Sequence, residues 1–144
     1  MGKNHKGAIV TINDRATGIL RIKKIKAKES ELVKQAVIEL LENWKPYLFT
    51  ITSDNGKEFA MHNEIAIVLE IDFYFVNSYS LWERGANENL NGLIRQYIPK
   101  STSFEEITIE RIIEIQEKLN YRPRKRFKFE TPNYMFNQKV AFIT

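Results

Sequence analysis

Two carboxylates stand in sequence contexts where chemistry is expected. Asp54 directly follows an apolar, β-branched stretch and precedes Asn55-Gly56, so we expect it at the C-terminal tip of a buried strand. Open α/β sheets bind their ligands at such tips. Glu88 should open a helix and share its polar face with Asn91 and Arg95. A carboxylate on a strand tip and another on a polar helix face can converge on one divalent cation, since hard cations prefer carboxylate oxygens.

Each acid also has a simpler interpretation. Asp54 could form a turn before Asn-Gly, as Asp residues commonly do. Glu88 alone could be an acid in the first helical turn, where it favours the helix dipole. Asn91 and Arg95 could hold Glu88 in place or contact a phosphate, and a solvated helix face is an equally good explanation for both.

Further motifs accompany the two acids in a fixed order. They are Ser53-Asp54-Asn55-Gly56-Lys57-Glu58-Phe59, the stretch 80–97, Leu119-Asn120-Tyr121-Arg122-Pro123-Arg124-Lys125 and Thr131-Pro132. Together they resemble the catalytic core of transposases of insertion sequence family thirty, which carry an integrase-like Asp, Asp, Glu triad. The resemblance covers nearly the whole chain. It implies that Asp54 is the second catalytic Asp and Glu88 the catalytic Glu, both ligands of Mg²⁺ or Mn²⁺.

The resemblance also implies an activity and partners. The activity is metal-dependent cleavage at a transposon end, followed by attack of the freed 3′-hydroxyl on target DNA. Two divalent ions about 4 Å apart suit such chemistry. The partners are DNA, as transposon ends and target, and further copies of the chain in the active complex. A helix-turn-helix region that finds the ends is expected upstream and is not encoded here. The DNA-binding residues are predicted to be Trp82, Arg84, Asn87, Asn91, Arg95, Arg122, Arg124, Lys125, Arg126 and Lys128, and the loop 78–86 is expected over the DNA end.

The fold class that follows is α/β. We expect one domain over residues 1–144 with a ribonuclease H-like mixed sheet flanked by helices and lacking its first, central strand. In the family, that strand and its catalytic Asp lie just upstream of the segment that here reads 2–7, so the chain is expected to be a fragment. Without the strand, the N-terminal hairpin would have no hydrogen-bonded path to the strand at 48–53.

Hydrophobic periodicity predicts the remaining elements. They are a hairpin of strands 8–13 and 19–25, a helix at 30–44, a strand at 48–53, a helix at 57–70, a strand at 73–76, a helix from Glu88 and a helix with Ile109, Ile112, Ile113, Gln116 and Leu119. Ser30 is the predicted N-cap of the first helix, and Pro46 should stop it. Lysines on the second strand predict a sheet edge that faces water. The apolar run 73–76 suits a strand buried on both faces.

Composition limits the function classes. With 144 residues and 43% apolar content, the chain suits one globular core. The absence of cysteine excludes disulfides and thiolate sites. No stretch is long and apolar enough to be a membrane span, and we expect a bacterial cytoplasmic, nucleoid-associated protein. The net charge is +4, with basic flanks around an acidic centre, which suits an enzyme that grips a polyanion.

Other candidates for chemistry are weaker. Residues 121–129 hold five cations and three aromatics, which favours DNA contact over a basic tail with two buried phenylalanines. His5 and His62 have no ligand spacing, so we interpret both as structural or solvated. Asp14 belongs to the hairpin turn, and Glu58 and Glu83 are not expected to join the triad. Two alternatives to an active transposase stay open: a catalytically dead remnant that binds DNA or a partner transposase, and another ribonuclease H-like nuclease.

Overall fold

The computed structural model describes residues 7–53, 56–76 and 90–143, with the side chains of 141–143 excepted. Its first elements are the strands β1 (Ala8–Asn13) and β2 (Leu20–Ile25), the helix α1 (Ser30–Leu41), the 3₁₀ turn Glu42–Tyr47, and the strand β3 (Thr50–Ser53). The 3₁₀ turn Lys57–Phe59, the helix α2 (His62–Leu69) and the strand β4 (Asp72–Phe75) follow. Residues 90–95 are helical, and after them come the 3₁₀ turn Phe104–Glu106, α4 (Ile109–Asn120), the 3₁₀ turn Lys125–Phe127 and α5 (Pro132–Ile143).

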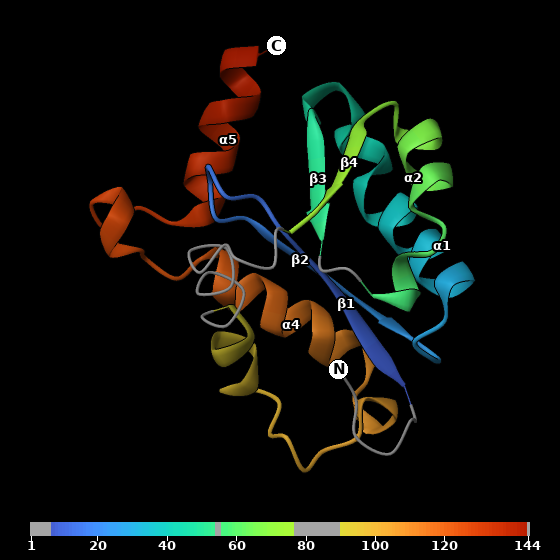
Figure 1. Cartoon of the computed structure of the whole chain (residues 1–144). Coiled ribbons are helices and arrows are strands. Elements are labelled where there is room, and N and C mark those ends of the chain that lie inside the picture. The colour runs from blue at the N-terminus through green and yellow to red at the C-terminus, as the bar shows by residue number, and fades with distance from the viewer. Residues whose placement is uncertain (1–6, 54–55, 77–89, 144) are drawn as a thin grey trace.

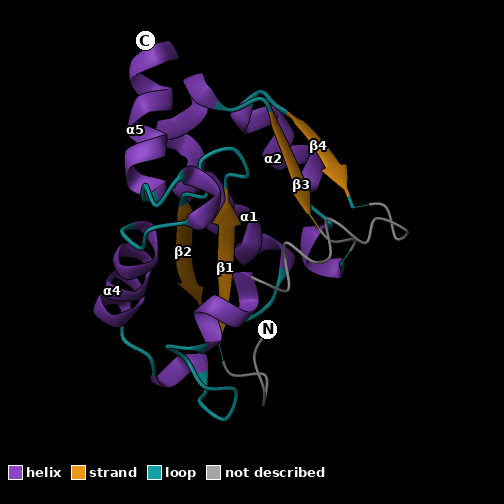
Figure 2. Cartoon of the chain, turned by 90° about the vertical axis from the view of Figure 1, so that its left-hand side faces the viewer, coloured by secondary structure: helices purple, strands orange, loops and turns teal. Residues whose placement is uncertain are grey.

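The strands form two separate pairs. β1 and β2 are antiparallel, with Ala8 opposite Ile25, whereas β3 and β4 are parallel, with Thr50 opposite Asp72. Within the described part of the chain, no ladder joins β1 to β3. Figure 1 and Figure 2 show the two pairs side by side, with α1 and α2 on one side and α4 on the other.

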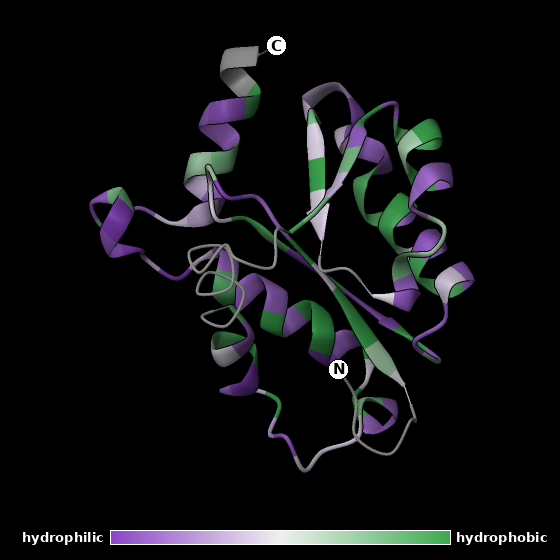
Figure 3. Ribbon diagram, viewed as in Figure 1, coloured by the Kyte–Doolittle hydropathy of each residue, from purple (hydrophilic) through white to green (hydrophobic). Residues whose placement is uncertain are grey.

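Each side of the sheets has its own apolar core. One core joins β1 to α1 and α2 and contains Val37, Leu41, Ile65 and Leu69. The second joins the other face of the hairpin to α4 and the segment 90–107, around Phe104. Figure 3 shows hydrophobic residues along β1 and on α1, α2 and α4. Since a fully buried aliphatic side chain contributes about 1.5–3 kcal/mol, these two clusters hold the layers together.

The outer edge of β2 is covered by side chains of α4. The Asn120 amide donates to the Leu20 carbonyl (2.9 Å) and its oxygen accepts from the Leu20 N–H (2.8 Å). The Gln116 oxygen accepts from the Ile22 N–H at 2.8 Å. The prediction that this edge faces water is therefore wrong, because two amide side chains take the place of a neighbouring strand. Lys24, expected in water, instead donates to the carbonyls of Glu105 and Ile107, both at 2.8 Å.

Several local predictions also differ from the structure. Ser30 is the first helical residue, Glu29 occupies the N-cap position without a side-chain bond, and α1 ends at Leu41, before Pro46. β4 is not buried on both faces, because Asp72 is exposed and Tyr74 is 53% exposed. The buried stripe of α4 runs through Ile112, Ile115 and Leu119, whereas Ile109 and Ile113 are exposed.

The helix α5 was not predicted from hydrophobic periodicity. It packs Phe136 against Trp44, with ring centroids 4.5 Å apart. In the described residues, no helix is long and apolar enough to cross a membrane.

Candidate functional site

The two predicted metal ligands lie outside the described residues, as do Trp82, Arg84, Asn87 and the predicted loop 78–86. Their neighbours in sequence are described. Asp54 follows Ser53, the last residue of β3, and Glu88 precedes the helical residues 90–95 by two positions. The end of β3 and the start of the helical segment 90–95 therefore flank the two predicted ligands in sequence.

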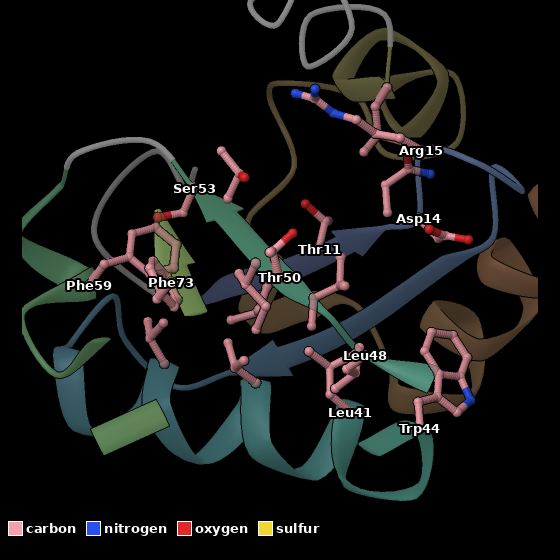
Figure 4. Close-up of a pocket in the computed structure, with 18 of the residues that line it drawn as sticks. Thr11, Asp14, Arg15, Leu41, Trp44, Leu48, Thr50, Ser53, Phe59 and Phe73 are labelled. Atoms are coloured by element: carbon pink, nitrogen blue, oxygen red, sulfur yellow. The ribbon is translucent and has the colours of Figure 1, made fainter. Parts of the chain in front are cut away.

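A groove runs between β1 and β3. It has a volume of about 510 Å³ and is lined by residues of both strands, with Val33, Val37 and Leu41 of α1 also contributing. Ser53 and Asn91 both line it, although 38 positions separate them in sequence. Figure 4 shows Ser53 near the tip of β3, with Thr11 and Thr50 on the two strands that border the groove.

The segment 90–98 is amphipathic as expected. Ile94 and Ile98 are buried in the core on the α4 side, and Leu90, Leu93 and Tyr97 pack against it. Asn91 is exposed. The Arg95 guanidinium stacks on the Phe104 ring, 5.0 Å from its centroid, and donates to the Ile98 carbonyl at 3.5 Å. These contacts tie Arg95 to Phe104 and to the end of its own helical segment. Contact between Arg95 and DNA stays a prediction.

The basic segment 121–130 is a compact turn. The Arg124 N–H donates to the Glu130 carbonyl and the Phe129 N–H donates to the Arg124 carbonyl, at 3.0 and 2.9 Å. These bonds close the turn with Lys128 and Phe129 at positive φ, 53° and 69°. Phe129 is 69% exposed, so the interpretation with two buried phenylalanines is wrong.

The cations of this turn divide into two groups. Arg122 donates to the Gln96 oxygen (3.1 Å) and Arg124 to the Leu119 carbonyl (3.0 Å), which ties the turn to the body of the protein. Burial lowers the pKa of Arg124 below its ordinary value, with the charges of Arg122 and Arg126 adding to the effect. Lys125, Arg126 and Lys128 are exposed, and the Arg126 guanidinium lies 4.3 Å from the Phe127 ring centroid.

The chain matches no protein-family model. It is 57% identical to the transposase for insertion sequence element IS4351 of Bacteroides fragilis over 140 residues, which cover 97% of this chain and 43% of that protein. Along nearly its whole length the chain is therefore similar to transposases of insertion sequences. It is also 37% identical to transposase InsI for element IS30A of Escherichia coli over 134 residues, which cover 92% of the chain and 35% of the relative. The chain thus spans less than half the length of these relatives.

The fold of this chain resembles that of the catalytic core domain of BIV integrase. The TM-score is 0.68, with 14% identity over 97% of this chain and 98% of the integrase chain. The predicted ribonuclease H-like fold is therefore confirmed. Helices flank the two strand pairs, as expected.

Among the described residues, no three His, Cys, Asp or Glu side chains gather closely enough to hold a metal ion. The described acids near the groove are engaged elsewhere. Glu58 pairs with Lys28 (3.3 Å), and Asp14 accepts from Thr17 (2.5 Å) and pairs with Lys139 (3.4 Å). Asp14 lies in the hairpin turn, as expected. Carboxylates with cationic partners are poor candidates to gather a metal ion.

Sequence analysis missed one structurally decisive polar residue. Asn120 is 6% exposed and holds the edge of β2. The sequence feature that could have indicated this role is a second amide residue, four positions after Gln116 on the apolar face of α4. His62 was interpreted as structural or solvated. The structure favours the first, since its Nδ1 lies 3.0 Å from the Phe59 carbonyl oxygen and its ring packs edge-on against Phe75.

Proposed function

We propose that this chain provides the catalytic core of a transposase that cuts and joins DNA strands with a divalent metal ion. The observation that carries the proposal is the 57% identity to a named transposase over 97% of the chain. The integrase-like fold supports the proposal, because it supplies a strand tip and a helix that can present carboxylates to one site. We expect the protein to act on DNA in the bacterial cytoplasm as an oligomer.

Asp54 and Glu88 are the proposed ligands of Mg²⁺ or Mn²⁺. The proposal is supported by their described neighbours, since Ser53 and Asn91 line the same groove. It is also supported by the donor set, because carboxylate oxygens suit hard cations. When bound, such an ion would supply a Lewis acid that neutralises charge at the phosphodiester being cut. Asn91, exposed on the helix that follows Glu88, is the proposed orienting residue for that carboxylate.

Metal binding tests the ligand assignment without requiring activity. Paramagnetic Mn²⁺ should broaden the amide resonances of Ser53 and Asn91 in a ¹⁵N spectrum at low micromolar additions, because it relaxes nearby nuclei. Asp54→Asn and Glu88→Gln should each abolish the selective broadening. Glu70→Gln is the matched control, since Glu70 is an acid paired with Lys45 on another surface (3.5 Å). Broadening that survives in both variants would contradict the assignment.

A DNA-binding remnant without catalysis is the second candidate. It is favoured by the exposed cations of the basic turn, Lys125, Arg126 and Lys128, which could bind DNA without a metal ion. A supercoiled-plasmid nicking assay with Mg²⁺ or Mn²⁺ separates the two candidates. Nicking by this chain that disappears in Asp54→Ala would refute the remnant. DNA binding with no nicking above the Asp54→Ala background would refute the active core.

DNA contact by the basic turn is the next prediction. Lys125 and Lys128 are exposed, and we propose that each neutralises one phosphate. Removing both with alanine should make the slope of log affinity against log salt shallower by about 1.8, at about 0.9 per phosphate. Fluorescence anisotropy with a labelled duplex measures the slope.

The control for this prediction removes the same charge elsewhere. Lys34→Ala with Lys45→Ala deletes two lysines whose partners are glutamates, Glu31 at 3.2 Å for Lys34 and Glu70 at 3.5 Å for Lys45. Equal slopes for the two double variants would show that net charge, and not the basic turn, governs binding. The remaining DNA-binding proposals are Trp82, Arg84, Asn87, Asn91, Arg95, Arg122, Arg124 and Arg126.

A further inference from the structure

Phe129 has the most exposed aromatic ring of the basic turn. Its side chain is 69% exposed, whereas Phe127 in the same turn is half-buried. The hairpin turn that contains Gly18 lies against Phe127, because a Cβ built on Gly18 would be 3.3 Å from Cε2 of that ring and 3.1 Å from Nη2 of Arg126. Phe127 therefore helps to fix the turn to the body of the protein, and the Phe129 ring is displayed to solvent.

The backbone of Phe129 has a conformation that most residues avoid. Its φ is 69° and that of Lys128 is 53°, in the left-handed region where a Cβ is crowded and glycine is favoured. The Arg124 carbonyl holds the turn in this shape by accepting from the Phe129 N–H at 2.9 Å and from the Phe127 N–H at 3.0 Å. The turn thus keeps a bulky exposed ring where glycine would cost less free energy. Strain of this kind at an exposed position points to a functional role for the side chain.

The charges around Phe129 indicate what its ring contacts. Residues 121–130 contain five cations and one acid. Of the cations, Lys125, Arg126 and Lys128 are exposed. A protein partner centred on this ring would bury or crowd these charges, and the centres of protein interfaces are depleted in charged residues. A DNA strand suits the surface better, because its phosphates pair with cations and the flat faces of its bases stack on aromatic rings.

We propose that Phe129 stacks on an unpaired nucleobase of a DNA strand whose phosphates contact the exposed cations of the basic turn. The base is unpaired because the faces of bases in a duplex are covered by the neighbouring pairs, and uncovering one requires a step to be unstacked. The bonds that close the turn hold the ring in place before binding, which reduces the entropy lost when DNA binds. The inference rests on the proposed DNA contact of the basic turn, and it adds the form of the DNA and the residue that contacts the base.

Two single-stranded probes test this proposal with the intact chain. One is a fluorescently labelled oligothymidylate, and the other has the same number of phosphates but carries abasic tetrahydrofuran sites in place of the thymidines. Fluorescence anisotropy gives the ratio of the two affinities. Phe129→Asn should lower this ratio by about fivefold or more, which is the contribution of one stacked base. Phe129→Trp should keep the ratio, because it keeps an aromatic ring. An equal ratio in wild type and Phe129→Asn would overturn the proposal.

Two measurements separate stacking from a structural role of the ring. Phe129→Asn should unfold at the same urea concentration as wild type or at a higher one, because asparagine adopts the left-handed region more readily. A clearly lower value would show that the ring packs against the protein and would overturn the proposal. Tyr74→Asn is the matched control and should leave the affinity ratio unchanged. It removes a ring that is 53% exposed on β4, beside the exposed acid Asp72 and well away from the turn between α4 and α5 (Figure 1).

Salt dependence distinguishes failure of this inference from failure of the proposed DNA contact. Phe129→Asn removes no charge, so the slope of log affinity against log salt should match that of wild type. If the affinity ratio ignores Phe129→Asn while the double variant Lys125→Ala, Lys128→Ala makes the slope shallower, the turn binds phosphates and only the stacking is wrong. If neither the ratio nor the slope responds to these variants, the DNA contact of the basic turn is wrong, and the stacking is wrong with it.

Discussion

Replacing Phe104 with alanine is expected to lower the free energy of unfolding by about 3–5 kcal/mol. The ring is 1% exposed and lies in the core that joins β1, β2, the segment 90–98 and α4. Removing the ring leaves a cavity. The surrounding elements cannot move in to fill it, because the backbone next to Phe104 is held in place. Lys24 holds the carbonyls of Glu105 and Ile107, and the backbone of Glu105 lies so close to Gly7 that a Cβ there would be 2.9 Å from the Glu105 nitrogen.

Urea denaturation followed by circular dichroism measures this effect. Phe104→Leu keeps most of the apolar volume and should cost less than about 1.5 kcal/mol if the core adjusts. Phe49→Ala removes the same side chain from a position that is 71% exposed and should change stability by less than about 0.5 kcal/mol. A Phe104→Ala variant that unfolds at the same urea concentration as Phe49→Ala would show that this core does not hold the two layers together.

The elements predicted best from sequence are those with one buried face. In α1, Val33, Val37 and Leu41 recur at helical spacing because one side of the helix packs on the strands, and the periodicity records that packing. The fold class followed from the order of such elements and from the motifs, and the integrase likeness confirms it.

What sequence could not predict depends on contacts between distant residues. The run 73–76 looked buried because apolar residues follow one another. Alternate residues of a strand point to opposite faces, so Phe73 packs against the core with α1 and α2 whereas Tyr74 is 53% exposed. The role of Asn120 depends on Leu20, which is 100 positions away. The positive φ of Lys128 and Phe129 is set by bonds that close the turn, and no residue type at those positions signals it.

For the candidate site, the sequence identified candidate ligands but not the groove beside them. Motifs identified Asp54 and Glu88, and these assignments stay predictions because both residues lie outside the described part of the chain. The groove that Ser53 and Asn91 share could not be read from sequence, because it depends on how the helix 90–95 lies relative to the strands. Arg95 was predicted to contact DNA. In the structure its guanidinium stacks on the Phe104 ring, and the sequence alone does not distinguish these two uses of a cation on a helix.

Replacing Asn120 with alanine is expected to lower the free energy of unfolding by about 2–5 kcal/mol. The amide side chain satisfies both the N–H and the C=O of Leu20, which is 1% exposed. After the substitution both groups stay buried without a partner, and each such group costs about 1–3 kcal/mol. Gln116→Ala orphans one donor, the Ile22 N–H, and should cost roughly half as much.

Urea denaturation and exchange of the Leu20 amide hydrogen together test this prediction. In Asn120→Ala the Leu20 amide should exchange faster than expected from the loss of global stability, since the edge of β2 opens locally. Asn137→Ala removes an exposed amide from α5 and should leave both quantities unchanged within about 0.5 kcal/mol. If Asn120→Ala matched Asn137→Ala, water would have to replace the side chain at this edge.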